Sequence, residues 1–265
     1  MSAHRRSFIA AFTFLTRLPV GGVAAHDASD LPLSVIYFPV VGLVIGLLGG
    51  IAFVAAHHLW STPVAVLLSM ATTVLATGAF HEDALADSFD GFGGGWNREQ
   101  VLAIMKDSRV GSYALVGVAL TLAIKAGALW TLATTVSVPG WTTDAFVVRA
   151  LVAGHVLGRW SSIPLIWRLP YVRLAQDGER ASAGKPFIDG VTVNRVAIAT
   201  VLTVLIVSIA LGWRALTAGG VALLVTVLAG AYFVRRIGGI TGDALGAANQ
   251  IVEVCVYLAL AARLG

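Results

Sequence analysis

Residues 36–57 read IYFPVVGLVIGLLGGIAFVAAH, an uncharged stretch near the start of the chain. A helix of this length crosses the roughly 30 Å hydrocarbon core of a bilayer. The remaining sequence has the same character: 57% of the 265 residues are hydrophobic and only 12% are charged, whereas soluble domains are about 25% charged. The mean hydropathy is +0.85. The sequence therefore predicts an all-α, polytopic transmembrane helical bundle that forms a single integral-membrane catalytic domain over residues 1–265.

Seven apolar stretches are candidate spans. They cover residues 36–57, 63–80, 111–136, 145–167, 196–213, 216–234 and 243–262. Thirteen Lys and Arg residues fall in the segments on the N-terminal side of the membrane, and only Arg214 and Arg263 fall in the others. Because basic loops stay in the cytoplasm, this bias places the N-terminus inside and the C-terminus outside.

The N-terminal residues before the first span predict a short interfacial helix. Phe8, Phe12 and Leu15 fall on one helical face, which suits a helix lying on the membrane surface. The alternative is a signal peptide cleaved after residues 23–25, and the early charge of Arg17 disfavours it. The net charge of +4 comes without a long Lys/Arg run, so no nucleic-acid partner is expected. The lone Cys255 cannot form a disulfide within the chain.

Residues 81–91, HEDALADSFDG, form an acidic cluster directly after the second span. On a helix, Asp83, Asp87 and Asp90 share one face and Glu82 lies beside it. Such carboxylates repel one another unless a cation lies between them, and Mg²⁺ is commonly held by one or two carboxylates together with substrate phosphates. The glycines at 91 and 93–95 are expected to break this helix. The alternative is an acidic helix end exposed to water.

Residues 105–113, MKDSRVGSY, lead into the third span. Lys106 and Arg109 can hold phosphate oxygens, with Asp107 and Ser108 between them as further substrate-binding candidates. Ser108 can also cap the following helix. The alternative interpretation is a basic flank that only sets the orientation in the membrane.

Residues 238–246, GGITGDALG, precede the last span. Thr241 or Asp243 can cap that helix, and the carboxylate of Asp243 is expected at the cytoplasmic rim near the acidic cluster. The glycines at 238, 242 and 246, like those at 42, 46 and 50, recur at a spacing that permits close helix packing. Asn249, Gln250 and Glu253 continue a polar stripe into the span.

Four basic side chains lie within the predicted spans: Lys125, Arg149, His155 and Arg159. Ionisable groups in lipid face other helices or a cavity. They either pair with Asp243 and Glu253 or bind an anionic substrate. The segment 168–195 is either a solvated connector, which we favour, or a substrate lid.

The chain resembles the adenosylcobinamide-GDP ribazoletransferase family, the cobalamin synthases. The resemblance rests on residues 14–20, 37–42, 77–95, 104–111 and 238–253, which occur in the family's order along nearly the whole chain. One departure is Ala84, where the family usually has glycine. The carboxylate spacing is unaffected, so we expect the change to be tolerated.

The resemblance implies a transferase that attaches α-ribazole, or its 5′-phosphate, to the phosphate of adenosylcobinamide-GDP and releases GMP. It also implies Mg²⁺ as cofactor and the bacterial inner membrane as location, with the site facing the cytoplasm. Membrane lipid is then a partner, and a homo-oligomer is left open. We expect Glu82, Asp83, Asp87 and Asp90 to hold the metal. The expected catalytic residues are Asp83, Asp87, Asp90 and Asp243, and the expected substrate-binding residues are Lys106, Asp107, Ser108, Arg109, Thr241 and Arg159.

Two other functions fit parts of the pattern. A phosphatidyltransferase that uses a CDP-activated donor also places aspartates and Mg²⁺ on membrane helices. An ion-coupled transporter would account for the ionisable residues within the spans. The acids, however, concentrate at one rim rather than at the midplane, where coupling sites lie.

Overall fold

The protein is a bundle of α-helices in a computed structural model that describes residues 2–20, 31–135, 139–172 and 190–262. Within these ranges the only β-type pairing is the isolated bridge between Tyr171 and Ile240. The all-α prediction is therefore confirmed. The cleavage site considered at 23–25 and residues 173–189 of the predicted connector or lid lie outside the described residues.

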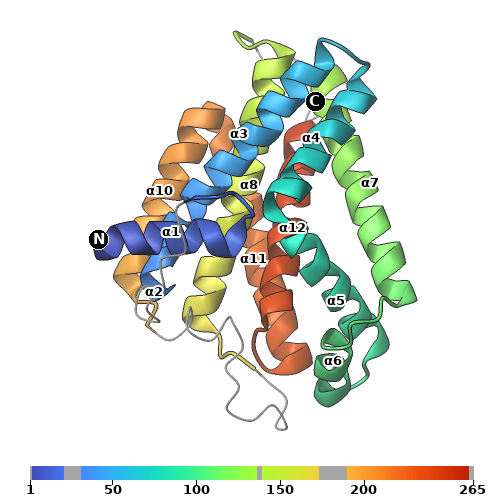
Figure 1. The fold of residues 1–265 in the computed structure, drawn as a ribbon, viewed down its shortest axis with the longest axis vertical. Helices are drawn as coiled ribbons and strands as arrows, with labels where there is room; N and C mark the ends of the chain where they lie inside the picture. Colours follow the sequence, from blue (N-terminus) through green and yellow to red (C-terminus); the bar gives the residue numbers. More distant parts are fainter. Residues whose placement is uncertain (1, 21–30, 136–138, 173–189, 263–265) are drawn as a thin grey trace.

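Each predicted span corresponds to a helix with similar bounds, and Figure 1 shows how the helices are arranged. They are α1 (Ala3–Leu15), α2 (Leu31–Ser34), α3 (Phe38–His57), α4 (Thr62–Thr77), α5 (Phe80–Gly94), α6 (Arg98–Met105), α7 (Ser112–Thr134), α8 (Thr143–Arg168), α10 (Val193–Leu211), α11 (Ala215–Ile237) and α12 (Gly242–Ala261). The short 3₁₀ segments η2 (Val35–Tyr37) and η4 (Gly212–Arg214) precede α3 and α11.

Helix α8 is the centre of the bundle, with α3 and α12 packed against it. Glycines permit this contact: a Cβ added at Gly42 would lie 2.6 Å from the His155 carbonyl oxygen, and one at Gly46 would lie 2.6 Å from the Val152 Cα. A Cβ added at Gly154 of α8 would lie even closer to the Tyr257 ring of α12. The packing role predicted for the glycines of the first span is thus confirmed. Gly238 and Gly242 have open space around them instead.

Helices α4 and α5 form a bent pair with an angle of 90° between them. The break is at Gly78 and Ala79, which both have positive φ, 67° and 57°. After the bend, α5 continues through Gly91 and Gly93 and ends at Gly94, with Gly95 as its C-cap, so the predicted break occurs only at the last two of these glycines. Gly91 and Gly93 provide room instead, because a Cβ would meet the side chains of Met105 and Tyr113 at 2.5 and 2.6 Å.

Length and composition support fewer spans than the seven predicted from the sequence. In the described part of the chain, the helical segments Leu31–His57, Ser112–Thr134, Val193–Ile237 and Gly242–Ala261 are long and apolar enough to cross a membrane. The bent pair α4–α5 adds a fifth if it is one broken span. The 45-residue segment Val193–Ile237 contains both α10 and α11. The count of seven stays a prediction.

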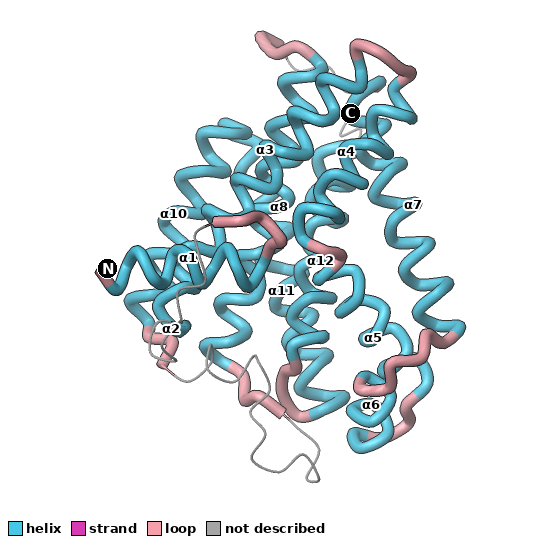
Figure 2. The backbone as a smooth tube through the Cα atoms, in the orientation of Figure 1, coloured by secondary structure: helices cyan, strands magenta, loops and turns pink. Residues whose placement is uncertain are grey.

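The predicted N-terminal helix is present as α1. Figure 2 shows it lying across the bundle, transverse to α10. Phe12 and Leu15 are buried against η2 and α3, and Phe8 is half-buried, so the predicted apolar face is the packed one.

Candidate active site

The acidic face of α5 meets the start of α12 at one end of the bundle. Asp83 is exposed, Asp87 is half-buried, and Asp243 lies in the first turn of α12. Asp87 experiences the negative charges of Asp243, Asp83 and Asp90, in that order of strength. Asp243 experiences Asp83 and the positive charge of Lys106. Segments more than 100 residues apart in sequence thus form one charged rim, as the predicted topology required.

Asp90 has a structural partner that the sequence did not reveal. Its Oδ2 accepts a hydrogen bond from the Gly111 N–H at 2.6 Å, and its Oδ1 accepts one from the Ala114 N–H at 2.8 Å. These are donors at the N-terminus of α7, which have no carbonyl partner inside the helix. Asp90 therefore caps α7 from another helix, and the prediction that Ser108 does so is wrong, since α7 begins only at Ser112.

The loop between α6 and α7 carries an exposed cation. The Nη2 of Arg109 lies 2.5 Å from the Asp107 Oδ2, and its Nε donates to the Asp107 Oδ1 at 2.9 Å. These hydrogen bonds lower the pKa of the Asp107 carboxyl to about 2. The Arg109 side chain is still 87% exposed. Asp107 thus orients the guanidinium, while the opposite edge of the group stays open to a ligand. Lys106 and Ser108 are exposed on the same loop.

Thr241 begins α12 as its N-cap. Its Oγ1 accepts a hydrogen bond from the Ala244 N–H at 3.1 Å, so the predicted cap is confirmed. The side chain is buried. Its hydroxyl is used by the helix terminus, and a direct contact of Thr241 with substrate stays a prediction.

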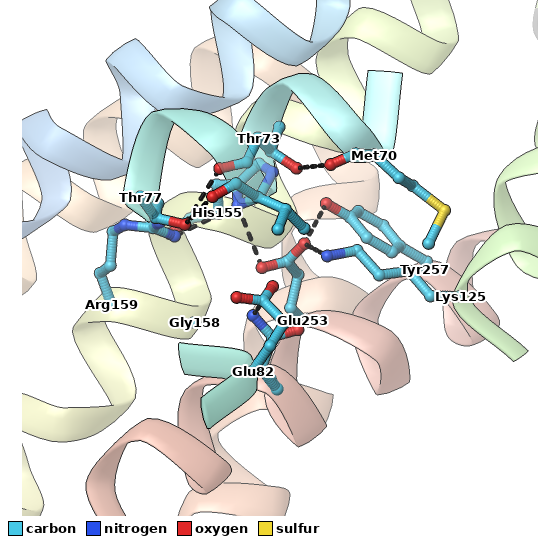
Figure 3. A network of polar contacts seen from close by, with 12 residues as sticks. Met70, Thr73, Thr77, Glu82, Lys125, His155, Gly158, Arg159, Glu253 and Tyr257 are labelled. Atoms are coloured by element: carbon cyan, nitrogen blue, oxygen red, sulfur yellow. Dashed lines mark hydrogen bonds and ion pairs between the residues drawn. The ribbon is translucent and has the colours of Figure 1, made fainter. Parts of the chain in front are cut away.

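Glu82 lies apart from the aspartates of α5. Its Oε1 accepts a hydrogen bond from the Gln250 Nε2 of α12 at 3.1 Å. Lys125 and Arg159 are the positive charges that act on it. Figure 3 shows Glu82 directed toward Glu253 inside the bundle. The structure therefore groups Glu82 with a buried network rather than with Asp83 and Asp87.

Glu253 is the centre of that buried network (Figure 3). Its Oε1 lies 2.6 Å from the Lys125 Nζ and accepts the Tyr257 hydroxyl at 3.0 Å, and its Oε2 lies 3.0 Å from the His155 Nδ1. Arg159 donates to the His155 carbonyl at 3.1 Å. Of the two roles considered for these cations, pairing with Glu253 is the one observed for Lys125 and His155.

The remaining cation of the predicted spans has a different role. Arg149 donates to the carbonyl groups of Ile209 and Ala210 at the end of α10, at 3.2 and 2.9 Å. Its guanidinium also lies 4.5 Å from the centre of the Trp141 ring. Arg149 therefore connects α8 to the end of α10.

The fit of a divalent cation depends on the chemistry of the rim. Across the described ranges, no three His, Cys, Asp or Glu side chains are already placed to hold one ion. The donors at the rim are carboxylate oxygens, the ligands that Mg²⁺ takes, and Mg²⁺ usually completes its shell with water and substrate phosphates. The residues present therefore suit Mg²⁺ bound together with a phosphate-bearing ligand.

The helices are long and apolar enough for a multi-pass membrane protein, and carboxylates lie beside exposed cations at one end of the bundle, as suits a membrane enzyme with an anionic substrate. The model of the family described as cobalamin-5-phosphate synthase, CobS, matches residues 7–261. The chain belongs to this family.

Similar proteins carry the corresponding name. The adenosylcobinamide-GDP ribazoletransferase of Shewanella frigidimarina is 40% identical over 255 residues, which cover 96% of this chain and 94% of the relative. The protein of the same name from Shewanella sp. strain ANA-3 is 39% identical over 254 residues, with 96% and 92% covered. No solved structure matches the chain.

Proposed function

We propose that the protein joins adenosylcobinamide-GDP to α-ribazole, or to α-ribazole 5′-phosphate, and forms adenosylcobalamin, or its 5′-phosphate, with release of GMP. Membership of the cobalamin-5-phosphate synthase family and the names of its relatives support this transferase activity. The observation that carries the proposal is the convergence of Asp83, Asp87 and Asp243 with Lys106 at one end of the bundle.

The chemistry is a displacement at phosphorus. A ribose hydroxyl oxygen of the acceptor forms a bond to the phosphorus that carries the cobinamide. The anhydride bond to the second phosphate breaks, and its electron pair leaves with GMP. The hydroxyl proton passes to a carboxylate of the rim. Asp87 and Asp243 are the better candidates, because both oxygens of Asp90 already accept backbone N–H groups.

The other side chains of the rim have two proposed roles, metal binding and neutralisation of the leaving phosphate. Asp83, Asp87 and Asp243 would hold Mg²⁺ against the diphosphate, and the bound ion would supply charge stabilisation for the attacking and leaving oxygens. Lys106 and the open edge of Arg109 neutralise the phosphate of the departing GMP. Asp107 keeps the Arg109 fork oriented for this contact.

The proposed location of the rim is the cytoplasmic side of a bacterial inner membrane. The basic segments that contain Lys106, Arg109, Arg235 and Arg236 support it, because basic loops are typical of the cytoplasmic side. Both nucleotide-activated corrinoid and ribazole then reach the site from the cytoplasm.

The test is an assay of the full-length protein in lipid nanodiscs. Adenosylcobinamide-GDP and α-ribazole 5′-phosphate are supplied with Mg²⁺ or with excess chelator, and GMP and the joined corrinoid are quantified. We expect both products in equal amounts, only with Mg²⁺. Release of GMP without joined corrinoid, or turnover that survives chelation, contradicts the proposal. A parallel reaction with a CDP-activated lipid donor should release no CMP.

A further inference from the structure

A groove of about 590 Å³ lies between α5, α7, α11 and α12. On α5, its wall consists of Leu85, Ser88, Phe89, Phe92 and Gly93. The helical period places these residues on the face of α5 opposite to Asp83, Asp87 and Asp90. The groove therefore lies behind the acidic helix and is separate from the rim.

The groove is open along the surface of the bundle. Three of its wall side chains, Tyr113, Leu228 and Tyr232, are 56%, 59% and 42% exposed. The helices α7, α11 and α12 belong to segments that are long and apolar enough to cross a membrane. In a membrane this surface faces lipid, so a lipid tail can enter the groove from the side.

One end of the groove carries a cation. Arg236 continues the helical face of α11 that forms the wall through Val225, Leu228, Ala229, Tyr232 and Phe233. Its guanidinium lies 5.6 Å from the ring centres of both Phe92 and Tyr232. It donates to the Tyr232 hydroxyl and to the carbonyl groups of Phe92 and Gly95. These bonds use three of the five N–H donors of a guanidinium, so a phosphate can accept from the others.

The dimensions of the groove suit an acyl chain. Val225 and Arg236 are eleven positions apart, which corresponds to about 16 Å along a helix. One leaflet contributes half of the roughly 30 Å hydrocarbon core, so its tails have a similar extent. A helix from a second copy, about 10 Å across, would fill roughly 1,250 Å³ over this length, about twice the volume of the groove.

The charge at the end of the groove determines which head group fits. Among the described wall residues there is no Asp or Glu to balance Arg236. A head group with net negative charge is therefore favoured over a zwitterionic one. Tyr113 and Tyr232 lie in the same wall, and tyrosine is typical of the level where the head groups begin.

We propose that this groove binds one acyl chain of an anionic phospholipid, with the lipid phosphate against Arg236. The tail fills the space behind α5 and contacts α7, α11 and α12 at once. The site goes beyond the proposed function, because no carboxylate of the rim lies in its wall. Lipid binding can therefore be measured without any turnover.

Two variants test the tail and the head group separately. Ala229→Leu places a larger side chain in the groove, and its matched control is Ser208→Leu. Ser208 lines another apolar groove, of about 460 Å³ between α8, α10 and α11, whose described wall has no charged side chain. Arg236→Gln removes the cation. Its control is Arg235→Gln, which removes the same charge from the adjacent, exposed position off the groove face.

The measurement is native mass spectrometry of the full-length, delipidated protein in detergent, titrated with dioleoylphosphatidylglycerol or dioleoylphosphatidylcholine. Wild type should bind one phosphatidylglycerol about fivefold more tightly than phosphatidylcholine. Arg236→Gln should abolish this preference, and Arg235→Gln should keep it. Ala229→Leu should weaken the binding of both lipids about fivefold or more, because the tail no longer fits. Ser208→Leu should bind both lipids like wild type.

Four outcomes overturn the assignment: no preference for phosphatidylglycerol in the wild type, a preference that survives in folded Arg236→Gln, an equal loss in Arg235→Gln, or unchanged binding in folded Ala229→Leu. A protein dimer that excludes the lipid would also overturn it. Arg236 also bonds to α5, so the melting temperature of Arg236→Gln is measured first. If this variant does not fold, the comparison of Ala229→Leu with Ser208→Leu decides.

Discussion

Asp87 experiences three other carboxylates, those of Asp243, Asp83 and Asp90. Negative charges gathered in this way repel one another and destabilise the folded chain unless a cation or a proton intervenes. A protein that needed only solubility at this end would gain nothing from their proximity. At the scale of single residues, the proposed Mg²⁺ would relieve this repulsion in addition to Lys106, whose positive charge already acts on Asp243.

Asp83 is the most accessible of these carboxylates and gives the sharpest test. Asp83→Asn should lower kcat/KM by at least about 100-fold, because the amide keeps the shape but loses the charge that holds a metal ion. The matched control is Asp144→Asn at the opposite end of the bundle, where Asp144 pairs with His57 at 2.8 Å. Its turnover should match wild type. GMP release by folded Asp83→Asn at the wild-type rate would remove Asp83 from the mechanism.

The Asp107–Arg109 pair leads to a prediction about pH. Arg109 lowers the pKa of the Asp107 carboxyl to about 2, so the carboxylate persists at any pH above that value and is lost only as the pH falls through it. Between pH 5 and 9 the Asp107–Arg109 pair should therefore contribute no pH dependence to kcat/KM. We expect Asp107→Asn to raise the donor KM while the shape of the profile of kcat/KM against pH stays the same. A displaced acid limb in that variant would contradict this prediction.

A substitution of Arg109 can separate the effect of its charge from the effect of its geometry. Arg109→Lys keeps a positive charge but loses the two-pronged contact that a guanidinium makes with phosphate. The donor KM should rise about tenfold, with a smaller change for α-ribazole, as measured by steady-state kinetics. An equal effect on both substrates would show that Arg109 does not discriminate between the two substrates.

At the scale of helices, the Lys125–Glu253 pair joins α7 to α12 in the interior. Both side chains are almost fully buried. Lys125→Met should destabilise the protein by about 3–5 kcal/mol, because the Glu253 carboxylate is left with less compensation. The double variant Lys125→Met/Glu253→Gln should recover much of this loss. Denaturant unfolding in detergent measures both, and a single variant within about 0.5 kcal/mol of wild type would contradict the expectation.

The crossing of α5 and α12 determines how the rim is assembled. A Cβ at Gly246 would lie only 2.4 Å from the Cβ of Ala84. Gly246→Ala should therefore separate the helices and reduce both stability and turnover, as measured by melting temperature and GMP release. Ala84→Gly removes the opposing methyl group, so it should restore activity to the Gly246→Ala variant. Lack of any such rescue would mean that this contact does not control the crossing.

Local sequence predicted these helices well where one physical effect dominates. Apolar runs predicted α3, α7, α10, α11 and α12. Thr241, which precedes α12, was predicted as a possible cap of that helix. The bend at Gly78 and Ala79 and the cap that Asp90 provides to α7 were not predicted. Each depends on how distant helices pack, and neither leaves a periodic pattern in the chain.

At the scale of the whole molecule, the arrangement of the helices explains why two distant motifs act together. Arg236 near the end of α11 donates to the carbonyl groups of Phe92 and Gly95 in and after α5, at 3.0 and 2.8 Å. These contacts hold α5, which carries the acidic cluster, and the start of α12 at the same end of the bundle. The rim could be predicted from the topology, because both motifs fall on the same side of the membrane. The groove behind α5 could not, since four helices contribute its walls.

The orientation and the number of spans can be tested together by labelling. In a Cys255→Ala background the chain has no cysteine, and Arg98→Cys and Trp213→Cys each add one. With seven spans, Trp213 lies outside and Arg98 inside. A membrane-impermeant maleimide should therefore label Trp213→Cys in intact spheroplasts, and label Arg98→Cys only after lysis. If the 45-residue segment Val193–Ile237 crossed the membrane once, residue 213 would lie within the bilayer and resist the reagent under both conditions. Labelling of Arg98→Cys in intact spheroplasts would instead reverse the orientation and place the rim on the outer face, away from cytoplasmic nucleotides.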